Sequence, residues 1–135
     1  MTNPSDEISE TSKPQEDEKA TLIAELQQAG IKHTPEAILR IAKLIDGKII
    51  FLERGNSASG LQHIVDNHRR DFAERDISEA EIPDAVMNAV ISGKIVGYQS
   101  PTRPIYQVTV NGKTQLIAVT VGSNGYLVCA NPASL

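Results

Sequence analysis

Apolar residues recur at helical spacing in two neighbouring segments, 19–30 and 34–47. In the first, they fall every three or four positions, and Gly30 supplies a natural helix C-terminus. In the second, Thr34 stands where an N-cap is expected and Pro35 at the first helical position. The pattern therefore predicts two helices that form a hairpin and need a partner for their apolar faces.

An S-x-x-Q pattern predicts the start of a third helix. Ser59 and Gln62 have the spacing of a capping box, in which the side chains of the first and fourth residues cap each other's backbone N–H groups. The stretch SGLQHIVDNHRRDF, residues 59–72, is therefore expected to be helical from about Gly60 onward.

A second capping box, Ser78 with Glu81, predicts the start of a fourth helix. Ile77 and Ile82 flank it as a hydrophobic staple. Because proline fits poorly beyond the first turn of a helix, we expect a separate turn first and the helix proper over residues 83–92.

The remaining residues alternate between apolar and polar in short runs, as strands do. Asn111-Gly112 between two of these runs is a hairpin signal, and GSNG at 122–125 is a second turn. The expected strands are 48–53, 94–99, 104–110, 113–121 and 126–130. Helices followed by an antiparallel meander predict an α+β fold, with N-terminal helices packed on one face of a roughly four-stranded antiparallel sheet.

Charge is divided unevenly along the chain. Residues 1–18 hold six acidic residues, one basic residue and little to bury, which predicts a disordered acidic arm. Residues 19–135 hold 11 acidic and 12 basic residues and have the length of a single domain. The net charge of −4 thus belongs to the arm, and the domain is free to carry a basic site.

Two further expectations concern solubility and the single cysteine. No apolar run is long enough to span a bilayer, and the first residues do not follow the signal-peptide pattern, so we expect a soluble chain. Cys129 lies in an apolar run and has no cysteine partner, so we expect a small buried hydrophobe.

The helix expected from Gly60 carries His63 and His68. At about 100° per residue the two lie roughly 140° apart, so a helix alone does not bring them together. Their spacing also differs from the i, i+4 spacing of helical zinc ligands, and we expect no metal and no other cofactor. His68 falls within the apolar stripe, as a core histidine or as a group that meets the sheet. His63 is either a solvated residue or a neighbour of a phosphate at the helix N-terminus.

Imidazole suits RNA cleavage because it exchanges protons near neutral pH. One imidazole can take the proton of a 2′-hydroxyl while another donates to the leaving 5′-oxygen, which leaves a 2′,3′-cyclic phosphate. A nearby cation would stabilise the charge on the phosphorane, although the Arg69-Arg70 pair can equally be a solvated helix face. The candidate cations are Arg54, Arg69, Arg70, Lys94 and Arg103.

The order of these motifs is similar to that of a known superfamily. FLERGN, SGLQHIVDNH, IPDAVMNAVISGKIVG and QLIAVTVGSNGYLVCANP resemble bacterial toxin and phage-associated nuclease domains of the barnase/EndoU/colicin/RelE superfamily, over roughly residues 48–132. The resemblance implies a BECR-like layout of two helices followed by an antiparallel sheet. It also implies a metal-independent endoribonuclease, acting as a toxin or phage-type effector on RNA such as tRNA.

The same resemblance implies partners and a setting. Toxic members are paired with a cognate immunity protein or antitoxin. They act in the cytoplasm and are often delivered as part of a larger secreted or phage-borne protein, with no membrane partner of their own.

The resemblance also implies which residues form the site. They are the two helix histidines and four sheet residues: His63, His68, Tyr106, Thr120, Ser123 and Asn124. Tyr106 and Thr120 have packing on a strand as an alternative role, and Ser123 and Asn124 have a turn. EndoU-type members add a lysine to the two histidines, and no lysine here falls in a matching motif. Which cation stabilises the transition state therefore stays open.

Two other functions stay open beside the nuclease. A non-catalytic relative could bind protein or nucleic acid as a phage structural or regulatory component, and the scarcity of aromatic residues for base stacking favours it. An immunity-type protein is suggested by the low overall pI, but the near-neutral domain counts against it. The nuclease, with His63 and His68 as general acid and base, is the function we expect.

Overall fold

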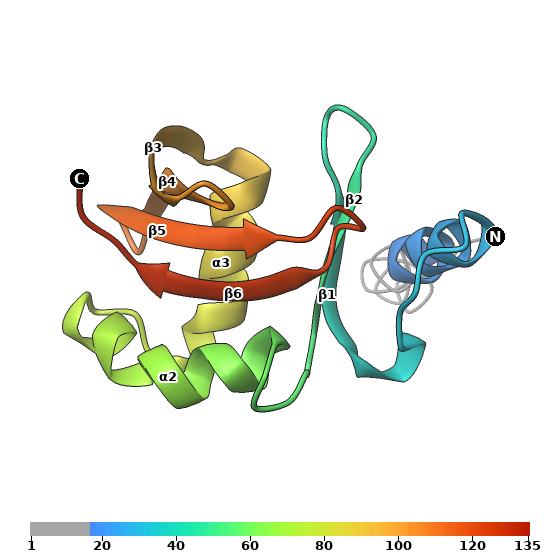
Figure 1. Cartoon of the computed structure of the whole chain (residues 1–135), viewed down its shortest axis with the longest axis horizontal. Helices are drawn as coiled ribbons and strands as arrows, with labels where there is room; N and C mark the ends of the chain where they lie inside the picture. The colour runs from blue at the N-terminus through green and yellow to red at the C-terminus, as the bar shows by residue number, and fades with distance from the viewer. Residues whose placement is uncertain (1–16) are drawn as a thin grey trace, which may run out of the picture.

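The computed structural model describes residues 17–135, so all but the last two residues of the predicted acidic arm lie outside the described residues. Those two residues already belong to the first helix, which spans residues 17–28 and begins earlier than expected. The helix buries Leu26, which packs with Ile38 and Phe51 in a cluster of its own. In Figure 1 this helix lies beside a hairpin of two strands, β1 (Ile38–Lys43) and β2 (Ile49–Glu53), away from the other two helices.

Residues 34–47 form a strand and a turn, so the helix predicted there is wrong. Pro35–Ala37 is a single 3-10 turn, η1, after which β1 (Ile38–Lys43) pairs with β2 (Ile49–Glu53) in an antiparallel hairpin. The strand prevails because β2 supplies hydrogen-bond partners for its backbone, which sequence periodicity does not report. Ile45, part of the predicted apolar helix face, is fully exposed in the turn.

The other two predicted helices are confirmed. They are α2 (Gly60–Glu74) and α3 (Ile82–Ser92), and η2 (Glu79–Glu81) is the separate turn expected before α3. The capping box at Ser78 is present, because its backbone N–H donates to Oε1 of the Glu81 side chain at 3.0 Å.

The capping box predicted for α2 is wrong, although the helix starts where expected. Ser59 is the N-cap residue, but its side chain makes no capping bond. Its hydroxyl lies 2.9 Å from the hydroxyl of Tyr126, and the Gln62 side chain donates to Oδ1 of Asp66. The Ser59 side chain therefore contacts Tyr126, far away in sequence, and does not cap the helix.

Four antiparallel strands follow in chain order: β3 (Lys94–Ser100), β4 (Arg103–Val110), β5 (Lys113–Val121) and β6 (Leu127–Pro132). Asn111 and Gly112 have φ values of 52° and 78°, as the predicted two-residue hairpin requires. The sheet and the β1–β2 hairpin join where the Phe51 N–H donates to the Gly125 carbonyl at 2.9 Å. A Cβ on Gly125 would lie only 2.0 Å from the Ile49 carbonyl oxygen, so this approach requires glycine.

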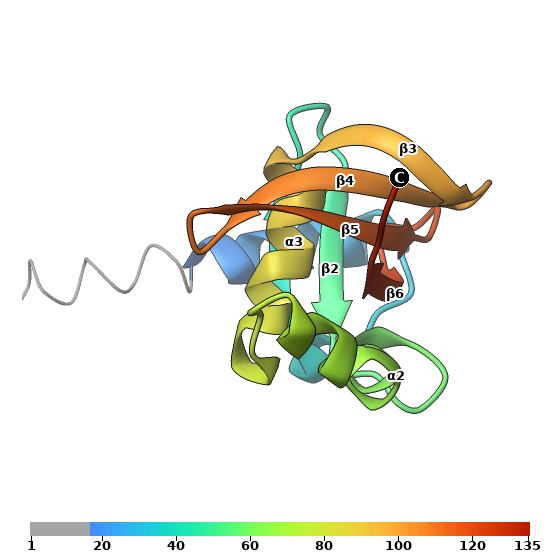
Figure 2. The ribbon, with the colours of Figure 1, turned by 90° about the vertical axis from the view of Figure 1, so that its left-hand side faces the viewer.

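Helices α2 and α3 cover one face of the four-stranded sheet, as the α+β prediction requires. Figure 2 shows the sheet as an upper layer with α3, β2 and α2 beneath it. Tyr106, Ile117 and Val119 point to this side and belong to the main core. The opposite face has a smaller cluster around Ile105 and Ala118. Cys129 is buried, as predicted.

Candidate polar active site

The two histidines of α2 are held separately. Nδ1 of His63 lies 2.9 Å from the Ser57 carbonyl oxygen and 3.0 Å from the side-chain nitrogen of Asn67. Nδ1 of His68 lies 3.0 Å from Oδ2 of Asp71, one turn further along the same helix. The His68 side chain is 25% exposed, so it is not sealed in the core. Among residues 17–135 no hydrogen bond links His68 to His63 or to the sheet.

Tyr106 and Thr120 lie on opposite faces of the sheet, so they cannot position one phosphate together as expected. Tyr106 pairs with Ile117, and successive strand residues alternate between faces. Its ring is in the main core, and burial raises the pKa of its phenol, with a further contribution from Tyr98. Thr120 accepts a hydrogen bond from Nε of Arg103 at 2.8 Å on the far side.

The predicted cations are dispersed. Arg69 pairs with Glu79 at 3.4 Å, and Arg70 lies beside it on the exposed face of α2. Lys94 is exposed at the start of the edge strand β3. Arg54 is exposed in the loop that follows β2 and does not line the cavity described next, although its neighbour in sequence, Glu53, does.

Polar side chains from four chain segments meet in one cavity of about 340 Å³, here called the polar cavity. The segments are the loop before η1, the end of β2, the loop into α2 and the β5–β6 turn. The residues that line it are Lys32, His33, Thr34, Glu53, Asn56, Ser59, Asn124 and Tyr126. Asn124 is the only sequence-predicted site residue in this lining, since Ser123 lies on the neighbouring side of the same turn.

Glu53 is the acidic group of the polar cavity. The residue is 9% exposed, and its Oε2 accepts a hydrogen bond of 2.9 Å from the Thr34 backbone N–H. This bond holds the Glu53 carboxylate beside Thr34, the residue that follows His33. A carboxylate held in this way can accept a proton through its second oxygen.

His33 is the basic group beside it. Its Nδ1 lies 2.7 Å from the Ile31 carbonyl oxygen, so Nδ1 carries the hydrogen and Nε2 is left as the proton-exchanging atom. Nε2 is buried and has no hydrogen-bond partner among the described residues. Leaving such an atom unpaired costs about 1–3 kcal/mol, and among the described residues it is the one buried side-chain nitrogen or oxygen atom without a partner.

The rest of the lining supplies hydrogen-bond donors. Asn56 Oδ1 accepts from the backbone N–H of Ala58 at 2.8 Å, and Asn124 Oδ1 accepts from that of Tyr126 at 3.1 Å. Both carboxamides therefore have their NH₂ groups available to other acceptors. Together with the ammonium of Lys32, these donors suit an anion such as a phosphodiester.

Two glycines allow the walls to approach each other. Gly60 has a φ of 82°, and a Cβ there would lie 2.8 Å from the Cα of Gly55 and 2.9 Å from the hydroxyl oxygen of Tyr126. Gly55 has a φ of 68°, and its Cβ would lie 2.1 Å from the Ser59 carbonyl oxygen. The loop therefore folds tightly enough to place the start of α2 against the β5–β6 turn.

Sequence reasoning missed Glu53 and His33. Glu53 ends an apolar run that was correctly predicted as a strand, and an acidic residue at the end of a buried strand is the signal that could have marked it. His33 fell in a linker between two predicted helices, one of which does not exist.

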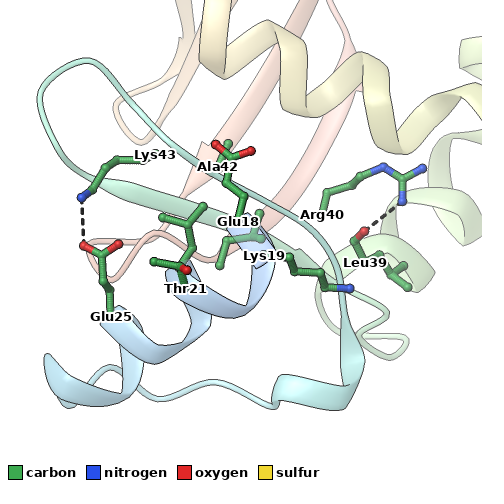
Figure 3. Close-up of a pocket in the computed structure, with 10 residues that line it drawn as sticks. Glu18, Lys19, Thr21, Glu25, Leu39, Arg40, Ala42 and Lys43 are labelled. Carbon is green, nitrogen blue, oxygen red and sulfur yellow. Dashed lines mark hydrogen bonds and ion pairs between the residues drawn. The ribbon is translucent and has the colours of Figure 1, made fainter. Parts of the chain in front are cut away.

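A larger groove, of about 600 Å³, lies between the first helix and β1. Figure 3 shows Lys43 paired with Glu25, at 2.8 Å between Nζ and Oε1. Arg40 is likewise paired with Asp84 at 2.8 Å. Three of the charged residues that line this groove, Glu25, Arg40 and Lys43, are therefore already in ion pairs, and no histidine lines it, so its size does not make it the better catalytic candidate.

Within the described part of the chain, no helix is long and apolar enough to cross a membrane, and no three His, Cys, Asp or Glu side chains gather as a metal ion would require. No protein-family model matches the chain, and no curated protein sequence matches it.

Proposed function

We propose that the protein is a metal-independent endoribonuclease whose general base and acid are Glu53 and His33. The observation that carries the proposal is the polar cavity, where a carboxylate, an imidazole with a buried unpartnered nitrogen and several anion-binding donors meet. Three motifs on which the superfamily resemblance rests, FLERGN, SGLQH and GSNGY, each contribute to its lining.

The proposed reaction is an internal transfer at phosphorus. Glu53 takes the proton from the 2′-hydroxyl, whose oxygen then forms a bond to phosphorus. The bond from phosphorus to the 5′-oxygen breaks, and Nε2 of protonated His33 donates its proton to that oxygen. The products are a 2′,3′-cyclic phosphate and a 5′-hydroxyl. Lys32 and the two carboxamides stabilise the additional negative charge of the phosphorane.

RNA is therefore the proposed substrate, with tRNA as the first to test, and the proposed site of action is the cytoplasm. The roles as toxin or phage-type effector and the pairing with an immunity protein or antitoxin come from the resemblance alone and are proposed on that basis.

The test is cleavage of total tRNA in the presence of EDTA. We expect Glu53→Gln and His33→Gln each to lower the rate about a hundredfold, the usual contribution of a general acid or base. Glu36→Gln, which removes an exposed carboxylate from η1, serves as the matched control and should leave the rate unchanged. Circular dichroism and thermal unfolding check that each variant folds.

Product analysis completes the test. Mass spectrometry should find 2′,3′-cyclic phosphate ends. Intact tRNA after incubation with wild-type protein, or full activity of folded Glu53→Gln protein, would refute the proposal.

A non-catalytic protein-binding role is the second candidate. The edge strand β3 exposes two large apolar side chains, Ile95 at 45% and Tyr98 at 62%. Exposed apolar residues on an open sheet edge favour the addition of a partner strand. Failure of the wild-type protein to cleave RNA would make this the leading function.

A further inference from the structure

A second cavity, of about 290 Å³, adjoins the polar cavity and is here called the apolar cavity. Three apolar residues, Ala29, Ile31 and Ile49, line it together with Lys48 and Ser123. Glu25, also in the lining, is neutralised by its ion pair with Lys43. The lining of the cavity therefore combines apolar and polar residues.

The two cavities share walls. Asn124 lines both of them. Ile31 lines the apolar cavity, and its carbonyl oxygen lies 2.7 Å from Nδ1 of His33, a lining residue of the polar cavity.

An RNA strand has the same alternation. Each charged phosphate is followed within one nucleotide by a flat base whose faces are apolar and whose edge is polar. A site that binds phosphate beside a site lined by both apolar and polar residues matches that repeat.

We propose that the apolar cavity binds the nucleobase next to the scissile phosphate. The inference rests on the proposed function, because it uses the polar cavity as the phosphate site. It adds that the protein recognises at least one base, and therefore that a nucleotide without a base at this position is a poor substrate.

Ala29→Leu tests the proposal because Ala29 is exposed and at the end of the first helix, so a larger side chain fills the cavity without entering the core. Ala24→Leu makes the same change on an exposed position of the same helix that lines neither cavity. The substrates are DNA oligonucleotides with one ribonucleotide, which allows a single cleavage point. Matched versions lack the base on one side or the other of that point.

We expect removal of one of the two bases to lower kcat/KM of the wild type about tenfold, as burial of part of a base would give. Ala29→Leu should lower kcat/KM for the intact substrate by a similar factor and leave the abasic substrate unaffected. Ala24→Leu should behave as wild type with both.

Binding separates this inference from the proposed function. Fluorescence anisotropy of a 2′-O-methyl analogue, which cannot be cleaved, reports the base preference without catalysis. Absence of cleavage together with a retained preference for the intact analogue would overturn the catalytic proposal alone. Equal cleavage and equal binding of intact and abasic molecules by the wild type would overturn the base-binding cavity.

Discussion

The hydroxyl of Tyr126 lies 2.9 Å from the hydroxyl of Ser59, 67 positions earlier in the chain. This contact joins the start of α2 to the β5–β6 turn across the mouth of the polar cavity. The Tyr126 ring is held in turn by an edge-on contact with Phe51, with 5.7 Å between ring centroids. Two lining residues of the cavity that lie far apart in sequence are therefore joined by a direct contact.

Removing either hydroxyl should cost stability without disrupting the fold. We expect Tyr126→Phe and Ser59→Ala each to lower the free energy of unfolding by about 1 kcal/mol, the net worth of a partly buried hydrogen bond. The double variant should lose about the same 1 kcal/mol as either single one, because the second hydroxyl has already lost its partner. Urea unfolding of the four proteins measures this coupling, and simple additivity of the two losses would show that the hydroxyls do not interact.

Gly60 should tolerate substitution much less well than another glycine of the same backbone conformation. Gly112 has a φ of 78° and open space around its Cα, whereas Gly60 has a φ of 82° and three crowding atoms within 3.0 Å of an added Cβ. We expect Gly112→Ala to cost about 1 kcal/mol from backbone strain alone. Gly60→Ala should cost about 3 kcal/mol, because a steric clash with Gly55 and Tyr126 adds to the strain.

Thermal unfolding of the two variants decides the point. A melting temperature equally lowered in both would mean that the backbone conformation, and not the close approach at the cavity, explains the glycine at position 60.

The sequence was sufficient for the elements whose partners are local. Capping at Ser78, the turn before α3 and the Asn111-Gly112 hairpin are all set by neighbouring residues, and all were predicted correctly. Apart from the capping box at Ser59, the error in secondary structure came at residues 38–43, where the spacing of apolar residues fits a helix face as well as a half-buried strand. Pairing with β2 stabilises the strand over the helix, and the spacing of apolar residues along the sequence does not indicate that pairing.

That error also hid the candidate site. In the β1–β2 hairpin Ile38 is paired with Glu53, which brings the segment just before β1 alongside the end of β2. The Thr34 N–H consequently reaches the Glu53 carboxylate, and His33 comes with it. A helix over residues 34–47 would not pair with β2, so it gives no reason to expect His33 near Glu53, and the predicted acid–base pair is His63 and His68.

Acid should destabilise the protein partly through Glu81. Hydrogen bonds from the Ser78 backbone, the Asn111 side chain and the Ser78 hydroxyl, in that order, hold the pKa of this carboxyl below its ordinary 4.5. As the pH falls, the Glu81 carboxyl is therefore protonated in the unfolded chain at a higher pH than in the folded protein. The stabilisation by Glu81 is complete above pH 4.5 and is lost as the pH falls through the lower pKa of the folded state. Glu81→Gln should be less stable than wild type at pH 7 and lose less stability than wild type on acidification to pH 3.

Urea unfolding at the two pH values measures this difference. Glu74→Gln removes an exposed carboxylate from the end of α2 and serves as the control. If Glu81→Gln and Glu74→Gln changed the acid sensitivity equally, the three hydrogen bonds would not be its cause.

The two histidines of α2 should respond differently to substitution. His63 contacts the Ser57 carbonyl at 2.9 Å, and the loop that contains Ser57 supplies Asn56 and Ser59 to the polar cavity. His63→Ala should therefore loosen one wall and lower kcat/KM for RNA about threefold, a positioning effect well short of the hundredfold expected for a general acid or base. Among the residues that the structure describes, the His68 side chain bonds only to Asp71 on its own helix, so His68→Ala should leave kcat/KM unchanged. The pH dependence of kcat/KM separates the two arrangements further, since it should keep its shape in both variants if Glu53 and His33 are the acid–base pair. Hundredfold losses in both variants, each with an altered pH profile, would instead assign the chemistry to α2 and leave the polar cavity as a structural feature.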